Sequence, residues 1–143
     1  MLVNLSMEKN LIIYPTLLNV ILIFLLYTKN TLDNRKAIKS KSLKMSYFKA
    51  YSGKVPDYIA VSRQTLKNQF ELPILFYFLI SIILYFDQVF LIDLFFAWLF
   101  VISRYLHAYI RLSSNKIKHR SITFQIGFYT LLLWFLKFSY NIF

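Results

Sequence analysis

The chain has 143 residues, of which 58% are hydrophobic and 20% aromatic, and only two glycines and three prolines. A soluble domain of this size is nearer half apolar, so this composition argues against a soluble globular protein. The sequence has no cysteine, which excludes disulfides, thiolate metal ligands and a cysteine nucleophile.

Long apolar runs, taken in chain order, predict four membrane-spanning helices. The first run, Leu11–Tyr27, has 17 uncharged residues, about the lower limit for a helix that crosses a bilayer. No small-residue cleavage site follows it, so we expect it to remain as a helix rather than to be removed as a signal peptide. Pro73 predicts a kink near the start of the second span. The chain is expected to be a single all-α transmembrane domain with helices at approximately residues 10–30, 57–86, 90–113 and 120–143.

The basic residues are concentrated in two segments. Ten of the 17 Lys and Arg lie between residues 29 and 67, and five more lie between residues 104 and 120. The turn between the second and third predicted helices offers only the acids Asp87 and Asp93. This is the positive-inside pattern, which puts both basic segments in the cytoplasm and both termini outside. The net charge of +11 is therefore interpreted as a topology signal and not as a nucleic-acid interface.

Two polar stripes interrupt the second and third predicted helices. They consist of Gln64, Asn68 and Glu71 on one helix, and Arg104, His107 and Arg111 on the next. The spacings i, i+4, i+7 and i, i+3, i+7 put each set on one helix face. With a rise of about 1.5 Å per residue, Glu71 and Arg104 lie at about the same depth, so we expect the two stripes to face one another.

Two interpretations of these stripes remain open. In the first, Glu71 and Arg104 form a buried ion pair that fixes the packing of the two helices. In the second, the surplus positive charge of Arg104, His107, Arg111 and Arg120 binds an anionic ligand, because one acid cannot satisfy all four. Part of that charge could instead reach water or lipid phosphate.

The sequence predicts neither a metal site nor a phosphate-binding loop. Its two histidines lack metal-ligand spacing, its carboxylates do not cluster, and no glycine-rich phosphate motif is present. The lysines of the first basic segment are expected to set the topology and to contact anionic lipid; they include Lys36, Lys39, Lys41 and Lys44.

Three motifs together resemble the MAPEG family, the membrane-associated proteins of eicosanoid and glutathione metabolism. The segment Asn68–Pro73, Asn-Gln-Phe-Glu-Leu-Pro, is similar to the family's Asn-x-x-Glu signature with its following proline. Arg104–His107 and then Arg120–Ser121 are similar to the third helix and the start of the fourth. The likeness covers nearly the whole chain and looks closest to uncharacterised bacterial members, which implies a bacterial cytoplasmic membrane.

The resemblance implies a homotrimer that binds glutathione between neighbouring subunits at the cytoplasmic side. On this pattern Asn68 and Glu71 hold the polar backbone and amino group of glutathione, and His107 contacts the tripeptide. Arg120 matches the arginine that stabilises the glutathione thiolate, and Ser121 adjoins it. A cation close to a thiol favours the thiolate, which is the nucleophile.

Further ligand-binding candidates come from the same stripes and from the first helix: Gln64, Arg104, Arg111 and Arg35. Arg35 matches a glutathione-contacting arginine of the family. Two residues depart from the family pattern, since Arg111 and Phe124 stand where tyrosines are found in family enzymes. The lost hydroxyls bear on whether the ligand is glutathione.

The favoured function is glutathione-dependent conjugation or peroxide reduction of a lipophilic substrate that enters from the bilayer. The alternative is a non-catalytic membrane protein that binds an anionic lipid or acts as an oligomeric scaffold, which the substituted tyrosines and the lysine-rich segment favour. A transporter is the weakest of the three, because the four predicted helices lack an obvious discontinuous pair.

Overall fold

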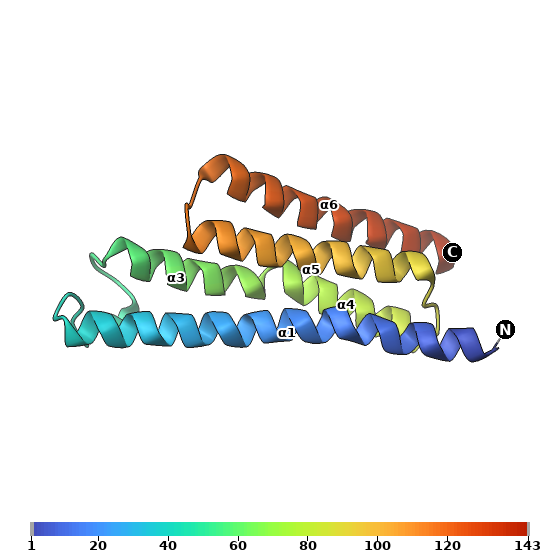
Figure 1. Ribbon diagram of the computed structural model, residues 1–143, viewed down its shortest axis with the longest axis horizontal. Coiled ribbons are helices and arrows are strands. Elements are labelled where there is room, and N and C mark those ends of the chain that lie inside the picture. Colours follow the sequence, from blue (N-terminus) through green and yellow to red (C-terminus); the bar gives the residue numbers. More distant parts are fainter. Residues whose placement is uncertain (1, 143) are drawn as a thin grey trace.

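The computed structural model describes residues 2–142, with side chains from residue 9 onward, and this part of the chain is helical without β-strands (Figure 1). The predicted all-α class is therefore confirmed. Four segments are long and apolar enough to cross a membrane: Lys9–Lys39, Asp57–Tyr85, Leu91–Leu112 and Ile117–Ile142. The elements are α1 (Leu2–Lys39), α2 (Tyr47–Ala50), α3 (Asp57–Lys67), the 3-10 turn η1 (Asn68–Phe70), α4 (Leu72–Tyr85), α5 (Leu91–Leu112) and α6 (Ile117–Ile142).

Helix α5 lies between the other long helices. It packs against α1, α3 and α6, while α4 packs against α6 and α1. Both ends of the chain lie at the end of the bundle where α4 passes into α5, and the α1–α3 connection lies at the opposite end (Figure 1). The two basic segments are thus on one side of the bundle and the termini on the other.

Helix α1 is longer than the sequence predicted, because it continues past residue 30 to Lys39. Its 38 residues correspond to about 57 Å, against roughly 30 Å for a hydrocarbon core. No glycine or proline interrupts the chain after Pro15 in this helix. Lys29 also donates to both carboxylate oxygens of Asp33 one turn later, at 2.7 and 2.6 Å. Part of the basic segment expected to be a loop is therefore a helical extension beyond the membrane.

The second span is broken rather than continuous. Helix α3 ends at Lys67, η1 follows, and Glu71 has non-helical backbone angles of φ −104° and ψ −97° before α4 begins at Leu72. Pro73 lacks an N–H, and its ring excludes a helical carbonyl four residues earlier. The kink expected near Pro73 is thus a full interruption of the helix just before it.

Aromatic rings fill the interface between α4, α5 and α6. The rings of Phe76 and Phe100 stack with their centroids 4.6 Å apart, and Trp134 stacks on Phe96 at 6.2 Å. Phe76, Phe100 and Trp134 are fully buried. Lipid tails are as apolar as these side chains, so this packing stabilises the bundle mainly through dispersion contacts.

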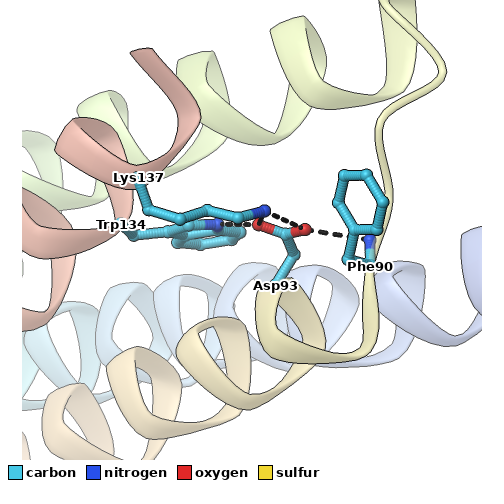
Figure 2. A network of polar contacts seen from close by, with 4 residues as sticks. All are labelled: Phe90, Asp93, Trp134 and Lys137. Atoms are coloured by element: carbon cyan, nitrogen blue, oxygen red, sulfur yellow. Dashed lines mark hydrogen bonds and ion pairs between the residues drawn. The ribbon is translucent and has the colours of Figure 1, made fainter. Parts of the chain in front are cut away.

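A buried ion pair fastens the start of α5 to α6 (Figure 2). Asp93 is fully buried, and its carboxylate accepts from Trp134 Nε1 at 2.6 Å and from Lys137 Nζ at 2.8 and 2.9 Å. The backbone N–H of Phe90 donates to the same carboxylate at 2.9 Å, and Lys137 Nζ lies 4.6 Å from the centre of the Phe90 ring. The sequence placed Asp93 in an acidic turn, whereas in the structure it is part of the core.

Removing the Asp93 carboxylate leaves the buried Trp134 N–H and the partly buried Lys137 ammonium without their acceptor. Asp93→Ala is therefore expected to lower the free energy of unfolding by about 3–5 kcal/mol, measured by thermal unfolding of the protein in detergent. Asp87→Asn removes the charge of an exposed acid that pairs with Lys9 in the neighbouring turn, keeps a side chain that tolerates the left-handed backbone at this position (φ 61°), and is expected to cost less than about 1 kcal/mol. The double variant D93L/K137M removes both charges and should recover much of the lost stability. A double variant that is as unstable as Asp93→Ala would contradict the role given to the ion pair.

Candidate functional site

The two polar stripes meet through Asn68 and His107, which are 7% and 2% exposed. The amide nitrogen of Asn68 lies 3.3 Å from His107 Nε2. The other ring nitrogen, Nδ1, lies 3.1 Å from the backbone carbonyl oxygen of Arg120 in the first turn of α6. His107 therefore links the break in the second span to the start of the fourth helix.

The charge of His107 is coupled to the orientation of the Asn68 amide. The Arg120 carbonyl oxygen can only accept, so in a neutral ring the proton lies on Nδ1 and the Asn68 nitrogen donates to Nε2. In the opposite orientation the Asn68 oxygen accepts from Arg111 Nη1 at 3.0 Å and from Nε2, while its nitrogen donates to the Gln64 carbonyl oxygen at 3.1 Å. That arrangement requires protons on both ring nitrogens if Nδ1 keeps its bond to the Arg120 carbonyl oxygen. In a neutral ring protonated on Nε2, Nδ1 would instead accept from the Thr123 hydroxyl, 3.5 Å away.

A cavity of about 250 Å³ opens beside this contact. Its lining residues are Asn68, His107, Arg111, Ile117, Arg120, Ser121 and Phe124. Five of them are candidates from the sequence, and no acidic residue is among them. The cavity also faces the first turn of α6, where the free N–H groups and the helix dipole favour a negative charge. It is a compact cationic pocket at the end of the bundle that carries the basic segments.

Arg120 reaches this cavity from the first turn of α6. Its Nη1 donates to the side-chain oxygen of Asn115 at 2.8 Å, and Asn115 has a left-handed backbone conformation with φ 47° in the α5–α6 link. Asn115 is neutral, so it positions the guanidinium without cancelling its charge. A cation in the first turn of a helix is unfavourable by itself, and a bound anion would remove that cost.

Arg104 lies one turn from His107 but does not line the cavity. It is fully buried, its Nη2 donates to the carbonyl oxygens of Thr123 and Phe124 at 3.2 and 3.3 Å, and its Nη1 has no partner among the described residues. The guanidinium lies between the rings of Phe100 and Phe124, 5.4 and 5.3 Å from their centres. Arg104 therefore fastens α5 to the backbone of α6.

The ion pair between Glu71 and Arg104, one of the two interpretations of the stripes, is not formed. Among the side chains that are described, from residue 9 to residue 142, Glu71 has no ion-pair partner, and it is exposed. The expectation rested on equal depth, which the helix rise provides, but the break at η1 changes the direction in which each residue points. Asn68 is turned inward, Glu71 outward, and Arg104 toward α6.

Two further candidates lie outside the cavity. Gln64 contacts Asn68, but it lines a neighbouring cavity of about 320 Å³ together with Arg111. Arg35 is exposed on α1 and lines neither cavity. In the part of the chain that the structure describes, no group of three His, Cys, Asp or Glu side chains could hold a metal ion.

Sequence reasoning missed Gly127, which makes room for Arg104. A Cβ atom built on Gly127 would lie 2.6 Å from Ser103 Oγ and would overlap the Arg104 guanidinium. A glycine in the middle of a helix lowers helix stability, so its presence here indicates a close approach between α5 and α6.

The MAPEG family model matches residues 11–140 of the chain, which includes the second and third spans, nearly all of the first and fourth, and the whole candidate site. No curated protein and no solved structure matches the chain.

Substituting Gly127 by alanine is expected to displace Arg104 and to lower the free energy of unfolding by about 1–3 kcal/mol, the usual cost of overpacking. Thermal unfolding in detergent measures this loss. Ser121→Ala, an exposed position in the same helix, serves as the control and should change stability little. A Gly127→Ala variant as stable as the parent would show that the α5–α6 contact is looser than described.

Proposed function

Because the chain belongs to the MAPEG family, we propose that it is a glutathione-dependent transferase or peroxidase that acts on lipophilic electrophiles. The observation that supports this most is the convergence of Asn68, His107, Arg111 and Arg120 on one cavity without an acid in its lining. Glutathione brings two carboxylates and a thiol, which suit a pocket of cations and amide groups. A hydrophobic second substrate would reach the site from the bilayer.

Arg120 has the central chemical role in this proposal. A guanidinium beside the glutathione sulfur favours loss of the thiol proton, because the thiolate is then paired with a fixed cation. The thiolate attacks an electrophilic carbon, the S–C bond forms, and the leaving group departs with its electron pair. With a hydroperoxide, the thiolate sulfur attacks the terminal oxygen, the O–O bond breaks, and the alkoxide leaves with the electron pair and takes up a proton to give the alcohol. The thiol of a second glutathione then attacks the sulfur of the sulfenic acid, which gives the disulfide and releases water. Ser121 lies beside Arg120 and lines the same cavity.

The cavity is small for the proposed ligand. Its volume of about 250 Å³ in one protomer is just below the roughly 300–1,000 Å³ typical of ligand pockets, so the proposal places the site between subunits. In the proposed homotrimer a neighbouring copy would supply the missing wall. Glu71 and Arg35, both exposed on the single chain, would then contribute polar groups at that boundary.

We further propose that the candidate site faces the cytoplasm of a bacterial inner membrane and that both termini lie outside. Because the chain has no native cysteine, single introduced cysteines report the topology directly. Ser46→Cys and Ser114→Cys should react with a membrane-impermeant maleimide only after permeabilisation, and Gln88→Cys should react in intact spheroplasts. The reverse labelling pattern would contradict this orientation.

Glutathione at millimolar concentration is expected to raise the unfolding temperature of the purified protein, because a ligand that binds only the folded state stabilises it by mass action. The gain is about 2.7 kcal/mol when the ligand concentration is a hundred times Kd. Arg120→Gln and Asn68→Ala should reduce this gain in stability. In ultraviolet difference spectra, glutathione should show a thiolate band with the parent protein, and Arg120→Gln should lose this band.

Lys118→Gln is the matched control for Arg120→Gln, since it removes one positive charge from the same turn of α6 at an exposed position outside the cavity. The proposal would be contradicted if Arg120→Gln and Lys118→Gln lost the same amount of glutathione-induced stabilisation, or if glutathione did not stabilise the parent protein. Stabilisation and a thiolate band without conjugation of a generic electrophile would instead favour a binding protein. Arg111 and Phe124 replace tyrosines of the family, so a binding protein without catalytic activity is the function to compare with the proposed enzyme.

A further inference from the structure

A second polar cleft lies between α1, α2 and α3 and shares no residue with the candidate site. Its volume is about 470 Å³. The lining residues are Tyr27, Asn30, Asn34, Tyr47, Tyr51, Arg63, Leu66, Lys67 and Phe70. They include two cations, two carboxamides and four aromatic rings, but no acid. The cleft is therefore electropositive and has both an apolar and a polar part.

The position of the cleft along the bundle matches the border of the hydrocarbon core. Tyr27 is the last residue of the uncharged run in α1, and Phe70 lies just before the apolar run that begins at Leu72. These two rings contact edge to face, with centroids 6.1 Å apart. Tyrosine is enriched at this depth in membrane proteins. One end of the cleft thus borders lipid tails, and the other, at Arg63 and Tyr51, lies among the basic residues outside the core.

Arg63 is held in a fixed position but keeps donors available. Its Nη1 donates to the Tyr47 hydroxyl and, at 3.4 Å, to the Tyr51 carbonyl oxygen. The guanidinium lies over both rings, 5.8 Å from the centre of Tyr47 and 5.3 Å from that of Tyr51. Among the described side chains, residues 9–142, Nε and Nη2 make no hydrogen bond, and no carboxylate pairs with Arg63 or Lys67. Arg63 and Lys67 therefore present two positive charges to the cleft without a neutralising carboxylate.

The wall that carries Tyr47 is packed rather than loose. Tyr47 belongs to a small buried cluster with Ala37, Leu43 and Ile59, and Ala37 and Ile59 are fully buried. This cluster holds α2 and the connection against α1 and α3. The aromatic support of Arg63 is therefore preorganised, which reduces the entropy lost when a ligand binds.

Asn30 adds a requirement for a donor on the ligand. Asn30 is half-buried, and its side-chain oxygen is buried in the wall of the cleft without a hydrogen-bond partner among the residues that the structure describes. A buried acceptor left unpaired is costly, and a hydroxyl group on the ligand would satisfy it. The occupant should therefore carry an anionic group for Arg63 and Lys67, a hydroxyl for Asn30, and an apolar part for Tyr27 and Phe70.

We propose that this cleft binds the headgroup of an anionic phospholipid that carries free hydroxyls, of the phosphatidylglycerol type. The phosphate lies between Arg63 and Lys67, a headgroup hydroxyl donates to Asn30, and the acyl chains pass Tyr27 and Phe70 into the bilayer. The cleft shares no lining residue with the cavity proposed for glutathione. It differs from general attraction to the exposed lysines because it depends on two cations in one cleft.

Native mass spectrometry of the detergent-purified, delipidated full chain tests the proposal. Phosphatidylglycerol is expected to bind in preference to phosphatidylcholine, and Arg63→Gln and Lys67→Gln should each weaken it by about tenfold. Lys49→Gln and Lys54→Gln remove the same charge from exposed positions outside the cleft and should weaken it less than about twofold. Lys67→Gln leaves the Arg63–Tyr47 contact intact, so it separates loss of binding from damage to the connection.

Three results would overturn the proposal. One is equal binding of phosphatidylcholine, and another is equal loss in the Lys49 and Lys54 controls. The third is competition by free glycerol phosphate as strong as that by the lipid, which would make the occupant a soluble phosphate compound. Glutathione-induced stabilisation is measured on the same variants, so failure of the lipid site and failure of the glutathione site are read separately.

Discussion

The constraint on which this structure depends is that polar groups within the bilayer must find their partners inside the protein. Helix α5 carries Asp93 near one end and Arg104 and His107 near the other, and all three are directed at α6. Asp93 binds Trp134 and Lys137, whereas Arg104 and His107 bind backbone carbonyl oxygens in the first turns of α6. Sliding or rotating one helix against the other would leave several of these groups without a partner, so they set both register and rotation. Dispersion packing of the aromatic rings alone would specify neither.

The candidate cavity is a consequence of the same attachment combined with the break in the second span. Because the helix is interrupted at η1, Asn68 reaches His107 from the C-terminal end of α3, while α4 restarts with its apolar face on α6. The cavity forms where these elements diverge from the start of α6. Arg104 is then a support of the site, since it holds the fourth helix in place, and Arg111 and Arg120 are the cations that face a ligand.

Part of this could be predicted from the sequence, and the failures have identifiable physical causes. Apolar run lengths are enough to find four spans, and helical periodicity is enough to bring Asn68 and His107 together. Depth along a helix does not give rotation around it, so Glu71 and Arg104 were expected to face one another although the break separates their directions. Asp93 lies beside a turn, and nothing local reveals a partner 44 positions later at Lys137. Gly127 gives no signal because its role is to leave space for a side chain on another helix.

The buried guanidinium of Arg104 has a further effect. No acid pairs with it among the side chains that the structure describes, residues 9–142, so it raises the electrostatic potential inside the bundle at that depth. Arg104 lies one helical turn from His107, which lines the candidate cavity. A fixed positive charge behind a pocket favours an anion over a cation inside it. The residue that attaches the fourth helix therefore also adds to the positive potential that an anionic ligand would meet in the cavity.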